Sequence, residues 1–217
     1  MKGSGSGSTL ETVYTSSAPS KGSSHPGFLT LAVIGEASLL LLAWGLARWL
    51  NISPLQEVRP TLGSVMWGVV ATVPLLLSLG WMVGSSIEPI RRLVALVIDH
   101  LGPLLAAHSM AGLAALAAMA GIAEEILFRG VIQPGLAHRL SEAWALLATS
   151  VLFGLVHFAS RAYAGFAAAM GLYLGALLLV VDSLLAPMIA HGLYDFAALV
   201  YVARRYRTMQ AQPPLPA

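Results

Sequence analysis

Residues 109–129 read SMAGLAALAAMAGIAEEILFR. The stretch is apolar up to Ala123 and then carries two adjacent carboxylates and an arginine. About 20 apolar helical residues cross the roughly 30 Å hydrocarbon core of a bilayer. Alanine and glycine allow helices to pack closely in lipid. The stretch therefore predicts a transmembrane helix over Ser109–Phe128 that carries charged groups at membrane depth.

The composition of the whole chain agrees with a membrane protein. Of the 217 residues, 57% are hydrophobic and 10% are charged, whereas soluble domains have about 25% charged residues. This balance excludes a soluble globular domain and a disordered chain. The formal net charge of +2, without a basic stripe, argues against a nucleic-acid partner. The absence of cysteine excludes disulfides, thiolate metal ligands and a cysteine nucleophile. We expect an all-α, polytopic helical membrane protein.

Apolar runs predict six or seven transmembrane helices. The runs are Phe28–Leu50, Gly63–Gly84, Ile87–Ala107, Ser109–Phe128, Ala143–Ala159, Ala162–Val181 and Leu184–Ala203. The third run contains Arg91, Arg92, Asp99 and two prolines, so it either spans the bilayer or lies in its interface. Ser141 is the expected start of the fifth helix, and Asp182 and Ser183 form a tight connection before the last one.

These runs divide the chain into four parts. Residues 1–27 are rich in Gly, Ser and Thr and predict a disordered tail, whose first residues are either a linker or a natural low-complexity start. Residues 28–108 hold N-terminal transmembrane or interfacial helices, and residues 109–203 hold a four-helix core with the active site. Residues 204–217 are a basic stop followed by a disordered tail. Because basic flanks stay in the cytoplasm, the stop predicts a cytoplasmic C-terminus, and six spans place the N-terminus on the same side.

Ionisable residues at membrane depth are costly and mark functional sites by default. Glu125 and Arg129 are four residues apart, so they can pair along one helix face. Glu124 points about 100° away from Glu125 and remains for another partner, as a general base. The structural alternative is that these charged residues form an interfacial ion cluster at a helix end. Glu36 has no spaced partner, and for it we favour a structural or interfacial role.

Two further elements carry histidine. His157 follows Phe153 by four residues, and a lone histidine on an apolar face is more often a packing residue than a functional one. His191 and Asp195 are four apart and share a helix face, where they form either part of a site or a pair that holds two helices together. Pro187, one turn before His191, is expected to kink the helix.

Together these residues come from three predicted spans and can converge in one polar pocket. Such a pocket either activates water or holds a metal through histidine and carboxylate ligands. The zinc-protease signature H-E-x-x-H and the serine-hydrolase signature G-x-S-x-G are absent from the sequence.

The order and spacing of these residues resemble the CPBP family, also called Abi proteins, which includes CAAX proteases and bacteriocin-processing enzymes. The matching motifs are Glu124-Glu125-x-x-x-Arg129, Phe153-x-x-x-His157 and His191-x-x-x-Asp195. The resemblance covers about residues 109–200. It implies a membrane-embedded glutamate endopeptidase whose partners are the lipid bilayer and a membrane-associated peptide or protein substrate. The compact, charge-poor chain is typical of a bacterial inner-membrane protein.

The resemblance also implies a role for each matched residue. Glu124 activates the attacking water with help from His157, and His191 and Asp195 form the oxyanion hole. Glu125 and Arg129 support this geometry.

Asp195 departs from the prenyl-protease branch, which usually has asparagine there. A carboxylate donates a hydrogen bond only when it is protonated, so Asp195 either joins the oxyanion hole or orients His191. The change also leaves open a divalent metal held by Glu124, His157, His191 and Asp195. We favour the metal-free reading and expect no cofactor, because no zinc-type spacing is present.

Two other functions compete with proteolysis. The first is a non-catalytic CPBP-like protein that binds a membrane partner or gives immunity to a bacteriocin. The second, ranked lower, is a proton-coupled transporter, which would need polar residues strung across the membrane.

Overall fold

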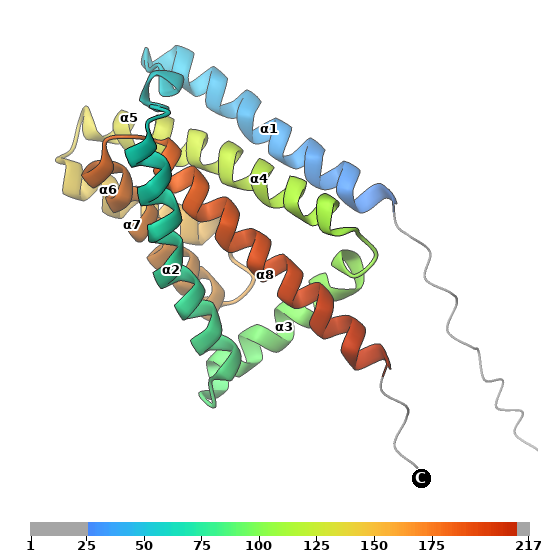
Figure 1. Ribbon diagram of the computed structural model, residues 1–217. Helices are drawn as coiled ribbons and strands as arrows, with labels where there is room; N and C mark the ends of the chain where they lie inside the picture. Colours follow the sequence, from blue (N-terminus) through green and yellow to red (C-terminus); the bar gives the residue numbers. More distant parts are fainter. Residues whose placement is uncertain (1–25, 212–217) are drawn as a thin grey trace, which may run out of the picture.

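The computed structural model of the chain describes residues 26–211, and every element in that range is helical (Figure 1). The α-helices are α1 (Pro26–Leu50), α2 (Leu62–Gly84), α3 (Glu88–Leu105), α4 (Met110–Leu127), α5 (Gln133–Ala137), α6 (Glu142–Val156), α7 (Arg161–Val181) and α8 (Leu185–Ala211). A 3-10 turn, η1, covers Pro54–Glu57, and a π-helical turn, η2, covers Phe128–Ile132. The predicted N-terminal tail lies outside the described residues except for its last two, which begin α1.

The all-helical, polytopic membrane class is confirmed. Within residues 26–211, five helices are long and apolar enough to cross a membrane, namely α1, α2, α4 with its continuation to Ala137, α7 and α8. The predicted span 143–159 is the shorter apolar helix α6 of 15 residues. At about 1.5 Å per residue it is roughly 22 Å long, so its C-terminal end lies at membrane depth if its start lies at the surface.

Helix α8 runs through the middle of the bundle and packs against α2, α3, α4 and α7, while α1 lies along the outer side of α4 (Figure 1). Helices α6 and α7 pack against each other as a pair. At the crossing of α4 and α8, a Cβ on Gly121 would lie 2.8 Å from the backbone nitrogen of Gly192. Only glycine allows the two backbones to come this close. The crossing brings the end of α4 beside His191.

The helix ends follow their sequence signals. Ser109, Ser141 and Ser160 cap α4, α6 and α7 by accepting hydrogen bonds from backbone N–H groups, as Ser141 was expected to do. Asp182 ends α7 in the left-handed conformation, with φ 53° and ψ 40°, and confirms the tight connection. Pro187 is the third residue of α8, where a helix has no intrahelical N–H partner to lose. The predicted kink at this proline is therefore wrong.

Helix α3 is not among the five long apolar helices, which favours the interfacial reading of residues 87–107. Its first turn holds Glu88, which is hydrogen-bonded to Arg92 at 2.6 Å and to Arg91. These partners, Arg92 first, lower the pKa of the Glu88 carboxyl. The opposite side of the helix is buried against the bundle through apolar residues that include Leu93, Ile98 and Leu105.

The end of α8 differs from the prediction. The basic residues Arg204, Arg205 and Arg207 were expected to end the membrane span at Ala203 and to begin a disordered tail, but α8 continues to Ala211. Arginine is a good helix former, so a basic flank ends the membrane span without ending the helix. Arg207 donates to the backbone carbonyls of Ala106 at 2.7 Å and His108 at 3.0 Å, which ties α8 to the connection between α3 and α4. Residues 212–217 of the predicted tail lie outside the described range.

Candidate active site

The Glu125 carboxylate is the buried hub of the site. Its Oε1 accepts hydrogen bonds from Arg129 Nη1 at 2.8 Å and from His191 Nδ1 at 2.8 Å. The predicted pairing of Glu125 with Arg129 is thus present in the structure. Arg129 Nη2 also donates to the carbonyl of Gly171 at 3.0 Å. Glu125 is 0% exposed and Arg129 1% exposed, so the network joins α4, α7 and α8 away from solvent.

A π-helical turn positions Arg129. Directly after α4, the N–H of Phe128 contacts the carbonyls of both Glu124 and Glu125. Such single turns of π-helix occur frequently at functional sites. The turn sets the Arg129 guanidinium over the ring of Phe153, with 4.5 Å between Cζ and the ring centroid. The first residue of the Phe-x-x-x-His motif therefore packs against the last residue of the Glu-Glu motif.

Glu124 and His157 face each other. Glu124 Oε2 lies 3.5 Å from His157 Nε2, and the Glu124 side chain is 12% exposed. His157 is the C-cap residue of α6, and its Nδ1 lies 2.8 Å from the carbonyl of Phe153. That carbonyl can only accept, so Nδ1 carries the proton and Nε2 faces Glu124. The Phe153–His157 spacing thus fixes both the place and the orientation of the imidazole.

His191 lies between two carboxylates. Its Nδ1 contacts Glu125, and its Nε2 lies 3.4 Å from Asp195 Oδ2. The His191 side chain is 4% exposed and that of Asp195 is 27% exposed. An imidazolium donates from both nitrogens and can serve both carboxylates. Glu125, rather than Asp195 alone, orients this ring.

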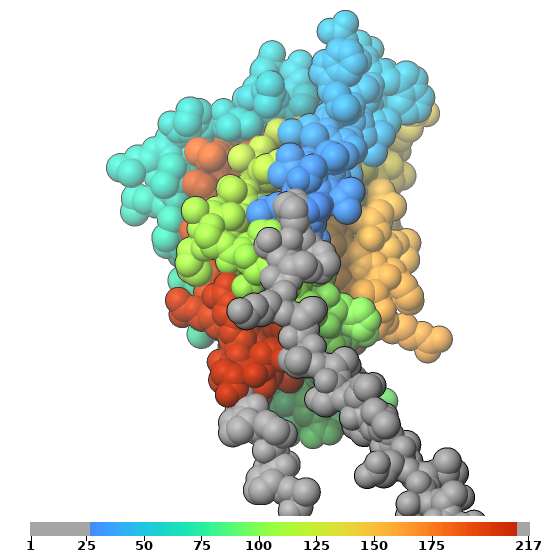
Figure 2. Space-filling view, turned by 90° about the vertical axis from the view of Figure 1, so that its right-hand side faces the viewer, coloured from blue at the N-terminus to red at the C-terminus, as the bar shows by residue number. Residues whose placement is uncertain are grey.

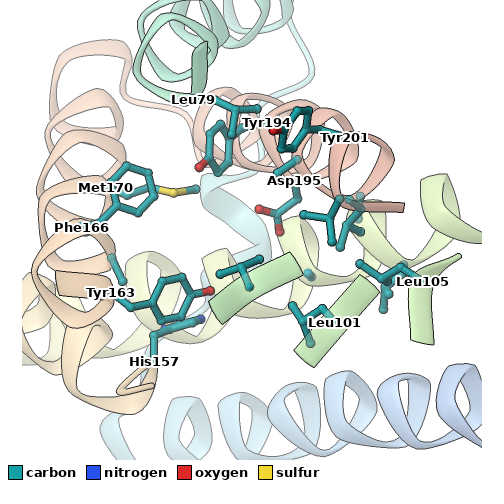
Figure 3. Close-up of a pocket in the computed structure, with 18 of the residues that line it drawn as sticks. Leu79, Leu101, Leu105, His157, Tyr163, Phe166, Met170, Tyr194, Asp195 and Tyr201 are labelled. Carbon is teal, nitrogen blue, oxygen red and sulfur yellow. The ribbon is translucent and has the colours of Figure 1, made fainter. Parts of the chain in front are cut away.

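A cavity of about 370 Å³ opens in front of these residues. Four predicted site residues line it, namely Glu124, His157, His191 and Asp195, whereas Glu125 and Arg129 are not among the lining residues. Aromatic and aliphatic side chains of α2, α3, α7 and α8 form most of the remaining wall. Figure 3 shows His157, Tyr163, Tyr194 and Asp195 around this space, with Leu101 and Leu105 of α3 on its other side.

The cavity also holds residues that the sequence did not single out. Glu36 of α1 lines it, although we favoured a structural or interfacial role for that residue. Its partners come from other helices, so no spacing within its own run could find them. Tyr163 and Tyr194 line the same cavity. The sequence signal for Glu36 was its charge inside an apolar run.

Within residues 26–211, no group of three or more His, Cys, Asp or Glu side chains is arranged to hold a metal ion. The four alternative ligands form two separate contacts, one between Glu124 and His157 and one between His191 and Asp195. The absence of a metal cofactor stays a prediction.

Comparison with known proteins agrees with the resemblance in the motifs. Residues 106–197 match the family model described as type II CAAX prenyl endopeptidase Rce1-like. The matched segment begins before α4 and ends just after Asp195, so it contains all three motifs. No curated protein and no solved structure matches the chain.

Proposed function

We propose, from the match of residues 106–197 to the Rce1-like family of CAAX prenyl endopeptidases, that this chain is an intramembrane endopeptidase that hydrolyses its substrate with a glutamate-activated water. The family implies a peptidase in a membrane, and the five long apolar helices agree with that setting. The proposed substrate is a membrane-associated peptide or protein, cut near its C-terminus or leader. The proposed location is a bacterial inner membrane.

In the proposed first step, Glu124 and His157 bind the attacking water. With Nδ1 protonated, a neutral His157 presents an unprotonated Nε2, and Glu124 presents a carboxylate. Both are acceptors, so a water molecule beside them can donate one O–H to each. As the water oxygen attacks the scissile carbonyl carbon, Glu124 takes its proton. The cavity wall of apolar and aromatic side chains limits competing bulk water.

The charge that develops on the carbonyl oxygen needs a donor. His191 Nε2–H is the candidate donor, because Glu125 holds the other side of the ring at 2.8 Å. The carboxylates of Glu125 and Asp195 stabilise the imidazolium that makes this donation possible. When the tetrahedral intermediate collapses, the C–N bond breaks and Glu124 returns its proton to the leaving amine. Donors preorganised in this way typically contribute about 10²–10³ in kcat.

One observation carries the proposal. Glu124 and His157 come from different helices, yet they face each other at 3.5 Å on the wall of the same cavity as His191 and Asp195. A binding protein has no need for a carboxylate and an imidazole in this arrangement, and a transporter would need polar groups strung across the bundle.

The test compares the N- and C-termini of membrane proteins in cells that express the wild type, Glu124→Gln or Glu142→Gln at equal levels. Glu142→Gln makes the same substitution on the exposed first turn of α6, outside the cavity. We expect new termini with the wild type and with Glu142→Gln, and none with Glu124→Gln. Identical termini in all three, together with a phenotype on deletion, would refute proteolysis and leave the binding or immunity function.

A further inference from the structure

The polar end of the cavity is acidic. Three carboxylates line it, from Glu36, Glu124 and Asp195, while no lysine or arginine is among its described lining residues. Arg129 of the same site is already engaged by Glu125 and by the Gly171 carbonyl. Among the described residues, the other ionisable groups of the cavity wall are the two imidazoles and the tyrosine hydroxyls. The mechanism uses Glu124 and assigns a supporting role to Asp195, but it leaves Glu36 without a task.

Glu36, which lines this cavity, has one carboxylate oxygen without a partner. Its Oε2 is closed to solvent and has no hydrogen-bond partner. Its carboxylate interacts electrostatically with Glu124 and Asp195, and with the imidazoles of His191 and His157. A buried carboxylate oxygen without a donor is costly, and the cost is removed when a ligand supplies a donor or a positive charge. Because Glu36 and Glu124 line the same cavity, a ligand group that meets Glu36 shares that space with the reacting bond.

Aromatic rings surround the same space. Tyr163 and Phe166 of α7 and Tyr194 of α8 line the cavity, and the Phe166 and Tyr194 ring centroids are 6.1 Å apart. Figure 3 shows Tyr163, Tyr194 and Asp195 directed into one space, with Phe166 beside them. Aromatic faces attract cations electrostatically, and more strongly when water is excluded. The rings are thus an observation independent of the carboxylates, and both point to a positively charged ligand group.

We propose that the cavity selects a substrate with a lysine or arginine side chain within one or two residues of the scissile bond, and that Glu36 is the specificity-determining residue. This inference rests on the proposed function. The cation pairs with Glu36 and Asp195, and its stem and charged head lie against the rings of Tyr163, Phe166 and Tyr194. A glutamate or aspartate at the same place is rejected, because it adds a fourth carboxylate to a wall whose His191 imidazolium is already held by Glu125 and Asp195.

The first measurement is equilibrium binding, which does not need catalysis. The probes are fluorescent apolar peptides of one length that carry a single Lys, Gln or Glu at successive positions. The receptors, all in lipid nanodiscs, are Glu124→Gln, Glu36→Gln/Glu124→Gln, and the matched control Glu124→Gln/Glu142→Gln. At the best position we expect the Lys peptide to bind about tenfold more tightly than the Gln peptide, which is about 1.4 kcal/mol. We expect the Glu peptide to bind more weakly than the Gln peptide.

The ratio of Lys to Gln affinity is the readout for Glu36. It should fall at least threefold when Glu36→Gln is added and stay unchanged when Glu142→Gln is added. Equal affinities for the three peptides at every position, or an unchanged ratio in Glu36→Gln/Glu124→Gln, would overturn the inference. Cleavage of the same peptides by the protein with Glu124 intact tests the proposed function separately. Charge-selective binding without cleavage supports the inference and refutes the endopeptidase.

Discussion

At the scale of single residues, Glu125 organises the site. One carboxylate oxygen receives both Arg129 and His191, which lie on either side of it in the bundle. The sequence could predict the first contact, because four residues separate the two partners on one helix. It could not predict the second, because 66 positions separate Glu125 from His191. The same limit applies to Glu36, whose place in the cavity depends on how α1 is rotated against α4.

Removing the buried Glu125 charge should lower the free energy of unfolding much more than removing a surface charge does. Glu125→Gln leaves Arg129 as an uncompensated buried cation, and such losses typically cost about 3–5 kcal/mol. The measurement is the free energy of unfolding in mixed micelles, with Glu142→Gln as the control. The double variant Glu125→Leu/Arg129→Met should recover much of the loss because it removes both charges. If Glu125→Gln were as stable as Glu142→Gln, the role of Glu125 as the buried hub of the site would be contradicted.

Asp195 should tolerate an amide but not an apolar group. In Asp195→Asn the side chain can donate directly to an oxyanion, so we expect kcat to remain within about tenfold of the wild type. In Asp195→Leu the His191 imidazolium loses one of its two carboxylates, and kcat should fall by about 10²–10³. The measurement is the kinetics of the substrate identified from the new termini. Equal losses in both variants would show that the carboxylate itself is required.

At the scale of helices, the site depends on the close crossing of α4 and α8. The motifs predicted which helices carry the chemistry, and the caps at Ser109 and Ser141 set where two of them begin. The sequence did not predict which pairs of helices touch, because small residues occur on many faces of these runs. The structure identifies Gly121 as the one that meets the backbone of α8 at Gly192.

A single methyl group at this crossing should separate the two helices. In Gly121→Ala the new Cβ would lie 2.8 Å from the Gly192 nitrogen and 2.9 Å from its Cα. We expect a loss of about 1–3 kcal/mol in unfolding free energy, together with a loss of activity. Gly165→Ala in α7 is the matched control, because nothing lies within 4 Å of its Cβ. There the better helix propensity of alanine should leave stability unchanged or slightly higher. Equal stability of the two variants would refute the tight crossing.

At the scale of the whole molecule, α3 decides the topology. If α3 lies in the interface, there are six spans, namely α1, α2, α4, α6, α7 and α8. An even number of spans places both ends of the described chain on one side of the membrane. Figure 1 shows the start of α1 and the end of α8 on the same side of the bundle. In the space-filling view, the end of α8 lies below the start of α1 (Figure 2). The sequence does not decide whether α3 spans the bilayer, because its prolines and charges suit an interfacial helix and its length suits a span.

Labelling of single cysteines settles which side each segment faces, since the chain has no cysteine of its own. In spheroplasts, the exposed positions of Arg92→Cys, Ala107→Cys and Arg204→Cys should all resist a membrane-impermeant maleimide until the cells are lysed. Arg139→Cys, on the opposite side, should react at once. Labelling of positions 92 and 107 from different sides would mean that α3 crosses the bilayer.

Helix α1 lies at the outside of the bundle, with 6% of its apolar window buried, yet it supplies Glu36 to the cavity. It also lies outside the segment that matches the family. In the proposed enzyme, the residues of the hydrolytic step thus lie inside that segment, and the proposed specificity residue Glu36 lies outside it. A change in α1 can then alter the proposed substrate preference while the residues of the three motifs stay the same. Proteins with the same three motifs and different first helices are therefore expected to share one reaction and to differ in their substrates.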